Sequence, residues 1–469
     1  MPRARARRLR STALLHTFAV GVAALAACGD RPVPNVVLLV VDTLRADHSS
    51  AYGYERDTTP RLRALAEEGI RFEQAYAPVG LTAPSHASLF TSLHPLSHGV
   101  VRNGLSLGKE HVTLTEYLGV RGYQSAAVVS SFVLDGKFGL DQGFDFYDDE
   151  LVPAEATVEL LEWEGHPVAE GFDRRADHTT RRAIEWLTKQ RDPQLPFFLF
   201  VHYFDPHSPY EPPGSHAGHF GPEGDGLAEQ VAAYDAEIAF TDTAIGELLD
   251  ALDEQGLAEN TLLIVTADHG EGLMQRGYML HGISVHEEEL RVPLIVRWPA
   301  ELSGGRSVPE PVSLQDVAPS VADLVPISRT GGVSEGNSFA SVLRGGEPLD
   351  AERPLYLFRR DFGDAHAELV TLGDEGSAEP AISVAGPQYG LREGRWKYVV
   401  APREGPPALF DLRRDPGEAE NLAAREPETA ARLAARLTAW LHGRPALPAA
   451  ASEPSEADRA RLRALGYSD

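Results

Sequence analysis

The sequence predicts an α/β fold with a large, mostly parallel sheet flanked by helices, plus a smaller C-terminal α+β subdomain. Continuous apolar runs at 36–41, 197–201 and 262–265 are typical of central strands that are buried on both faces. Segments with helical apolar spacing lie between these runs. The chain has 469 residues, enough for one large domain and one small one, and its character changes after about residue 340.

Helices are expected between the three runs. One begins at Thr59-Pro60, a second covers 114–121, and a third covers 231–255 and ends before Gly256. The intervening segment 208–227 is rich in proline, glycine and histidine, which predicts a loop over the edge of the sheet. We therefore expect a main domain over 34–340.

The remaining residues predict a subdomain and a tail. Short strand signals appear at 355–357 and 396–400, and a helix near 427–441 places Leu433 and Leu437 on one apolar face. A segment rich in proline, alanine, serine and glutamate follows. These features predict a subdomain over 341–443 and a flexible tail over 444–469.

The N-terminus predicts export. Five arginines lie within the first ten residues, and an apolar run over 13–27 leads to Cys28, the only cysteine of the chain. This pattern is typical of a bacterial lipoprotein, with a signal peptide over 1–27, a lipidated Cys28 and a linker over 28–33. An uncleaved anchor helix is the alternative. Either arrangement attaches an exported protein to the lipid bilayer, in the periplasm or at the cell surface.

The charge balance limits the partners. The chain carries 43 Lys and Arg residues against 69 Asp and Glu residues, a net charge of −26. A surface this acidic repels nucleic acid, so no nucleic-acid partner is expected. A small anion can still bind where a metal ion inverts the local field.

Metal-competent side chains follow the predicted strands. Asp42 ends the first run, and Asp268-His269 follows the third. In open α/β sheets, ligands bind at the carboxyl ends of the strands. Two carboxylates and an imidazole there suit one divalent ion such as Ca²⁺, Mn²⁺, Mg²⁺ or Zn²⁺. A single aspartate at a strand end has the plainer interpretation of a helix cap.

Thr82 offers a further oxygen to this set. Pro84 suits the first turn of a helix, so Thr82 lies at or just before a helix N-terminus, where backbone N–H groups favour an oxyanion. A divalent cation on its oxygen would lower the pKa of this hydroxyl. The alternative interpretation is that Thr82 only caps the helix.

Five segments together carry a family resemblance. They are 34–45, 82–100, 197–210, 267–294 and 394–422. In this order they resemble the sulfatase branch of the alkaline phosphatase superfamily, from Pro34 to Leu441. The resemblance implies the alkaline-phosphatase/sulfatase-like fold, a C-terminal antiparallel sheet and a metal-dependent hydrolase of small anionic esters.

The resemblance also implies roles for single residues. Asp42, Asp268, His269 and Thr82 would hold the metal, and Thr82 would also be the nucleophile. The remaining implied positions are His207 as general acid, Asn103 as a contact to the anion, His202 and His281 as oxyanion or proton-transfer partners, His86 in place of the motif's arginine, and Thr43 in place of a second aspartate.

The departures from the family pattern change the predicted chemistry. Threonine at position 82 cannot become formylglycine, which needs a cysteine or serine there. The lysines expected of the family fall at Ser130 and Ile283, so positive charge around the anion is thinner. We therefore expect a covalent Thr82 ester, formed from a sulfate ester or a phospho- or phosphonate ester and then hydrolysed by water.

Other interpretations stay open. A phospho-headgroup transferase at the membrane is one, and a non-catalytic binding lipoprotein with a sulfatase fold is another. A two-metal site would need Asp205, His207 and His281, whose spacing does not resemble the two-metal branch, so one ion is expected. Substrate specificity is expected in the loops 144–175 and 208–232.

Overall fold

The computed structural model describes residues 33–151, 162–163, 166–167, 173–222, 224, 226–325, 334–362, 386–444 and 452–464. The predicted signal peptide, Cys28 and nearly all of the 28–33 linker lie outside the described residues. Within the described ranges, none of the helices has both the length and the apolar character needed to cross a bilayer.

The main domain is built on an eight-stranded sheet. In spatial order its strands are β14 (Arg306–Val308), β2 (Ile70–Phe72), β13 (Leu294–Arg297), β9 (Thr261–Ala267), β1 (Asn35–Val41), β8 (Phe197–Tyr203), β4 (Gln124–Val128) and β5 (Phe146–Asp148). The prediction of a mostly parallel sheet is confirmed, with one exception. Strand β13 runs antiparallel to both of its neighbours, so the sheet is mixed.

The three apolar runs form the centre of this sheet. β1 lies between β8 and β9 and is parallel to both. All seven residues in each of these strands are buried, which explains why their sequences are continuously apolar rather than alternating. Val41 pairs with both Tyr203 and Ala267, so the three strands end at one level and the residues that follow them meet.

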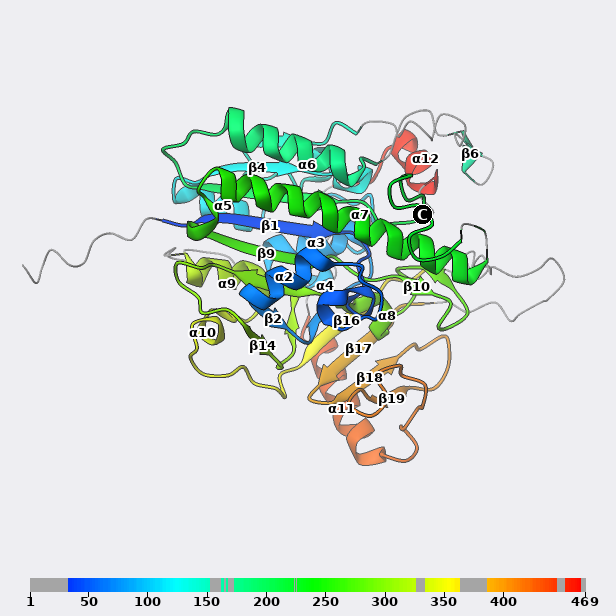
Figure 1. The fold of residues 1–469 in the computed structure, drawn as a ribbon. Coiled ribbons are helices and arrows are strands. Elements are labelled where there is room, and N and C mark those ends of the chain that lie inside the picture. Colours follow the sequence, from blue (N-terminus) through cyan, green and yellow to red (C-terminus); the bar gives the residue numbers. More distant parts are fainter. Residues whose placement is uncertain are drawn as a thin grey trace, which may run out of the picture.

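Helices cover both faces of the sheet (Figure 1). On one face α2 (Pro60–Glu68) and α6 (Ala176–Glu185) pack against the long α7 (Leu227–Glu254). On the other, α3 (Thr82–Thr91), α5 (Leu114–Val120) and α9 (Val317–Leu324) pack together. The shorter helices are α4 (Pro95–His98), α8 (Glu287–Leu290) and α10 (Ala340–Leu343). The helices predicted from 59, 114 and 231 are therefore all present.

The C-terminal subdomain has its own small core. Its antiparallel sheet runs in the order β16 (Leu355–Arg359), β17 (Gln388–Glu393), β18 (Trp396–Val400) and β19 (Ala408–Asp411). Helix α11 (Pro427–His442) packs on β17 and β18 and buries Leu433 and Leu437 there, as its apolar face predicts.

The structure differs from the predicted flexible tail. Residues 456–464 form helix α12, and its Leu462 is buried in the main core. Two ion pairs fix this segment, Lys137 to Asp458 at 2.7 Å and Arg102 to Glu453 at 2.7 Å. The polar composition of this segment predicts a flexible tail, but Leu462 packs it against the main domain.

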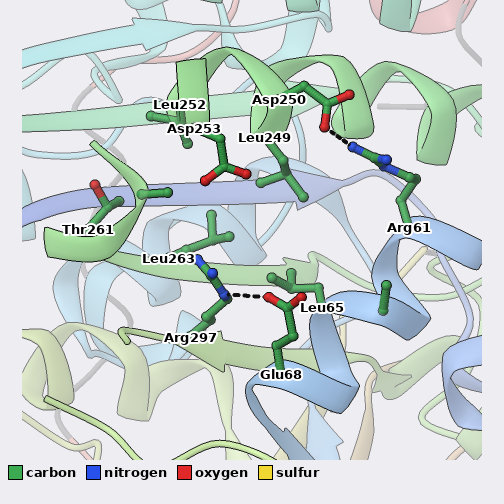
Figure 2. A pocket seen from close by; sticks show the side chains of 12 residues that line it. Arg61, Leu65, Glu68, Leu249, Asp250, Leu252, Asp253, Thr261, Leu263 and Arg297 are labelled. Atoms are coloured by element: carbon green, nitrogen blue, oxygen red, sulfur yellow. Dashed lines mark hydrogen bonds and ion pairs between the residues drawn. The ribbon is translucent and has the colours of Figure 1, made fainter. Parts of the chain in front are cut away.

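A cavity of about 220 Å³ lies away from the strand ends that carry Asp42 and Asp268 (Figure 2). It is lined by Thr261 and Leu263 at the beginning of β9, and ion pairs Arg61–Asp250 and Arg297–Glu68 border it. It therefore lies at the opposite end of β9 from Asp268.

Candidate active site

The ends of the three central strands bring the predicted ligands together. Asp42 follows β1 and Asp268 follows β9, and both are fully buried. Thr82 is the first residue of α3, and Leu81, not Thr82, occupies the capping position. The interpretation of Thr82 as a helix cap therefore does not fit the structure. The hydroxyl of Ser85, one turn along α3, donates to the Asp268 carbonyl at 2.7 Å and holds this helix against the end of β9.

The Nε2 atom of His269 lies at the centre of the group. It is 3.3 Å from Thr82 Oγ1, 3.5 Å from Asp268 Oδ2 and 3.7 Å from Asp42 Oδ1. The Nδ1 atom of the same ring lies 2.9 Å from the Gly270 carbonyl and donates to it. The lone pair is therefore on Nε2, as in histidines that bind metals.

The carboxylates of this group lack the partners that buried charges require. The two carboxylate oxygens of Asp42 have no hydrogen-bond partner among the described residues. The Oδ2 atom of Asp268 has none among them either. Burial raises the pKa of Asp42. The pKa of Asp268 is also raised, mainly by burial and to a lesser extent by the negative charge of Asp42. A buried unpaired carboxylate is costly unless a cation compensates it. Asp42, Asp268, His269 and Thr82 thus fit a divalent metal ion.

His269 itself responds to these carboxylates. Burial opposes a charge on its ring, but Asp268 and Asp42 outweigh burial, so the net pKa of His269 is raised. The group thus attracts positive charge in the absence of a metal.

Asn103 lies at the N-terminus of α3. Its Oδ1 atom accepts from the Ala83 N–H at 2.9 Å, and its Nδ2 atom is buried with no partner among the described residues. The predicted contact to the anion thus corresponds to a donor that is held beside Thr82 with its hydrogens free.

His207 and His281 lie on the other side of His269. The rings of His269 and His281 are 4.4 Å apart, and those of His281 and His207 are 4.9 Å apart. His207 donates from Nδ1 to the Ser208 carbonyl at 2.6 Å, which leaves Nε2 as its second, proton-accepting nitrogen. Burial lowers the pKa of His207 to about 3, so the ring is neutral at pH 7.

His86 and His202 form a second group next to Asp42 and Asp268. Their rings are 5.1 Å apart, and both are fully buried. His202 Nε2 lies 3.4 Å from Asp42 Oδ2. Burial lowers the pKa of each ring to about 4, so both are neutral at pH 7.

Other sequence-based candidates lie elsewhere or act differently. Asp205 accepts from the Ala176 N–H at 2.7 Å at the start of α6 and is not in the metal group. Thr43 contributes its backbone N–H, which donates to Asp268 Oδ1 at 3.2 Å. Ser130, at a position where lysine was expected, donates to the His202 carbonyl at 2.6 Å.

Glu271 was given no role by the sequence. Its Oε1 atom lies 3.2 Å from His281 Nδ1, so it orients that ring, and burial raises the pKa of Glu271 to about 8. Its position directly after Asp268-His269-Gly270 is the sequence signal that could have identified it.

Comparisons with known proteins identify the family. The sulfatase family model matches residues 34–327. The chain is 26% identical to the ulvan-active sulfatase of Formosa agariphila, over 84% of this chain and 78% of that protein. It is 28% identical to the multifunctional alkaline phosphatase superfamily protein PehA of Trinickia caryophylli, over 83% of this chain and 91% of that protein.

A solved structure shows the same fold. The phosphonate monoester hydrolase of Agrobacterium radiobacter superimposes with a TM-score of 0.69 at 24% identity, covering 88% of this chain and 96% of that one. The fold and the site define an ester-hydrolysing enzyme. The chain belongs to the sulfatase family.

Proposed function

We propose that this enzyme hydrolyses anionic esters, either sulfate or phospho- and phosphonate esters, through a covalent intermediate on Thr82 Oγ1. The observation that carries the proposal is the position of this hydroxyl. It lies at the start of α3, 3.3 Å from His269 Nε2, beside two buried carboxylates that fit a divalent cation. The names of the relatives, a sulfatase and a phosphonate monoester hydrolase, support the same substrate classes.

The cation held by Asp42, Asp268 and His269 would lower the pKa of a hydroxyl and draw negative charge from the ester oxygens. In the first step Thr82 Oγ1 loses its proton to solvent and bonds to phosphorus or sulfur, as the bond to the leaving oxygen breaks. His207 Nε2 gives that oxygen a proton. Water then attacks the same atom and gives a proton to His207, the bond to Oγ1 breaks, and Oγ1 regains a proton from solvent.

His207 must be protonated for the first of these steps. Burial keeps its ring neutral in the absence of substrate, and the carboxylate of Asp42 acts in the opposite direction. A bound anion stabilises the imidazolium form in the same way, so substrate binding itself would raise the pKa of His207. His207→Gln would then slow esters with poor leaving groups by about 100-fold and spare those with good ones.

The identity of the nucleophile favours phosphorus over sulfur. A threonine ester cannot collapse to an aldehyde, so its release requires attack by water at the central atom. We expect phospho- and phosphonate esters to turn over faster than sulfate esters. A cavity of about 440 Å³, lined by Arg175, Tyr210 and the first turns of α7, lies in the segment 208–232 that is predicted to set specificity.

The experiment compares Thr82→Ala with Thr82→Ser on a panel of the three ester classes. Thr82→Ala should reduce kcat at least about 1,000-fold, and Thr82→Ser should retain much of it, because serine keeps the hydroxyl. Acid-quenched wild-type enzyme should carry the transferred group on the peptide that contains Thr82, as seen by mass spectrometry. Full activity in a folded Thr82→Ala variant would reject the proposal.

We also propose that the protein is an exported lipoprotein of a bacterial membrane, acylated on Cys28. The sequence before Cys28 supports this, and its arginine-rich start and apolar run are typical of such signals. Radiolabelled palmitate should label the full chain and fail to label Cys28→Ser. Equal labelling of the two would exclude this attachment.

A further inference from the structure

Three buried side chains beside the predicted metal centre form a second set of ligands. A ring nitrogen of His86, a ring nitrogen of His202 and a carboxylate oxygen of Asp268 lie within 4.8 Å of one another. Side-chain accessibility is 0 % for all three. None of the roles derived above uses His86 or His202 as a metal ligand.

The hydrogen bonds of these side chains leave lone pairs available. His86 Nδ1 donates to the Thr82 carbonyl at 2.8 Å, and its Nε2 atom has no partner among the described residues. A ring whose N–H binds a backbone carbonyl presents its other nitrogen as a ligand. Neither nitrogen of His202 has a hydrogen-bond partner within the described part of the chain, although Nε2 lies 3.4 Å from Asp42 Oδ2.

The two carboxylate oxygens of Asp268 have different surroundings. Its Oδ1 atom accepts from the backbone N–H groups of Thr43 and His269, at 3.2 and 2.8 Å. Its Oδ2 atom accepts no hydrogen bond from the described residues, and it lies 3.5 Å from His269 Nε2 and 3.8 Å from His86 Nδ1. It therefore lies between the rings of His269 and His86, and the His86 atom that faces it is Nδ1, the nitrogen that donates to the Thr82 carbonyl.

The lack of cationic side chains among the described residues near the proposed anion site favours a further cation beside Asp268. No arginine or lysine of the described ranges forms an ion pair with Asp42 or Asp268. His86 stands where the resemblance predicts an arginine, and its imidazole is buried against the rings of Phe200 and His202. A single divalent ion would leave a dianionic substrate facing less positive charge than an arginine and lysines supply.

We propose that His86, His202 and Asp268 bind a second divalent cation, adjacent to the Asp42–Asp268–His269 centre and sharing Asp268 with it. Two imidazoles and one carboxylate are the ligand set preferred by Zn²⁺, and Co²⁺ accepts it as well. Ligand atoms of a tetrahedral zinc ion lie about 3.4 Å apart, so closing this set requires the His86 ring to rotate and bring Nε2 toward Asp268 Oδ2. The sequence predicts one ion and offers only Asp205, His207 and His281 as ligands for a second. The proposed second ion uses different residues.

The experiment measures metal content without turnover. Purified full chain is dialysed against Zn²⁺ and its zinc is counted by mass spectrometry. Wild type should hold two ions per chain, and His86→Ala and His202→Ala should each hold one. His94→Ala is the matched control, because His94 is an equally buried imidazole next to Trp440 and outside both sets. It should hold two.

One ion per chain in the wild type, or two ions in both His86→Ala and His202→Ala, would overturn the inference. If these variants do not fold, anomalous diffraction from zinc-loaded wild-type crystals decides. Two peaks are expected, one of them between His86, His202 and Asp268, and a single peak beside His269 rejects the second site. One ion together with normal Thr82-dependent hydrolysis would reject this inference and leave the proposed function intact.

Discussion

Asn103 performs two tasks with one amide. Its oxygen binds the Ala83 N–H at 2.9 Å and fixes the first turn of α3, while its buried nitrogen has no partner among the described residues. A preoriented donor of this kind stabilises charge that develops on a substrate oxygen. The same residue thus supports the helix and presents a free donor at the proposed anion site.

Asn103→Ala should lower kcat about 100-fold, since it removes a donor aimed at the transition state. Asn103→Asp keeps the acceptor for Ala83 but replaces the donor with a repelling carboxylate, so it should be at least as damaging. Steady-state kinetics on metal-loaded enzyme measures both. Asn421→Ala is the control, because Asn421 also caps a backbone N–H but in the C-terminal subdomain. Unchanged kcat in Asn103→Asp would contradict the donor role.

Thr43 shows how a local conformation serves the site. It is β-branched yet has φ of 55°, a region that such residues rarely adopt. This conformation turns its N–H toward Asp268 Oδ1. Strain of this kind persists where the surrounding structure requires it, and here it orients the carboxylate of Asp268.

At the scale of elements, the turn after β9 determines where the ligands lie. Gly270 follows Asp268 and His269, and its N–H donates to the Glu289 carbonyl at 2.7 Å. A Cβ atom at this position would lie 2.1 Å from the Glu288 carbonyl oxygen. The turn therefore packs against backbone that cannot move aside cheaply.

Gly270→Ala should displace Asp268 and His269 and weaken metal binding by at least about tenfold, or about 1.4 kcal/mol. Isothermal titration with Mn²⁺ measures the affinity, and circular dichroism checks the fold. Gly119→Ala is the matched control, since a Cβ there meets nothing within 4 Å. It lies in α5 and should be neutral or stabilising. Equal metal affinity in the two variants would contradict this account.

The C-terminal helix α12 supports the same site from a distance. Leu462 occupies the space beside Gly104, next to Asn103, and a Cβ at Gly104 would lie 2.3 Å from the leucine's Cδ1. Ser452 and Ser106 also share a hydrogen bond at 2.7 Å. A segment from the end of the chain thus packs on the loop that positions Asn103.

At the scale of the whole molecule, one buried ionic network joins the two domains. Lys397 of β18 is fully buried and lies 3.0 Å from Glu418 and 3.1 Å from Glu287, at the start of α8. Glu418 also pairs with His286 at 2.9 Å and accepts from the Glu287 N–H at 2.8 Å. The subdomain is therefore attached by charge as well as by packing to the part of the main domain that follows Asp268 and His269.

Glu418→Gln should lower the free energy of unfolding by about 3 kcal/mol, because it leaves buried Lys397 short of a partner. Burial opposes ionisation of Glu418, but Lys397 and His286 outweigh it, so the pKa of Glu418 lies below its ordinary 4.5. A lowered carboxyl pKa stabilises the fold above pH 4.5, and that stability is lost as pH falls further.

Urea unfolding between pH 6 and pH 3 tests this prediction. Wild type should lose more stability on acidification than Glu418→Gln does. Glu420→Gln, which alters an exposed ion pair with Arg425, should behave like the wild type. Parallel pH profiles for wild type and Glu418→Gln would show that Glu418 does not carry this dependence.

The sequence by itself determined the fold class, the central strands and the identity of Asp42, Thr82, Asp268 and His269 as one group. It succeeded because buried parallel strands require continuous apolar runs, and because residues after such strands share one edge of the sheet. Only the tertiary structure decided that Asp205 caps a helix, that Glu271 orients His281, and that His86 and His202 meet at Asp268. These contacts join segments more than 60 residues apart or depend on the direction of single side chains, which hydrophobic spacing along a chain does not encode.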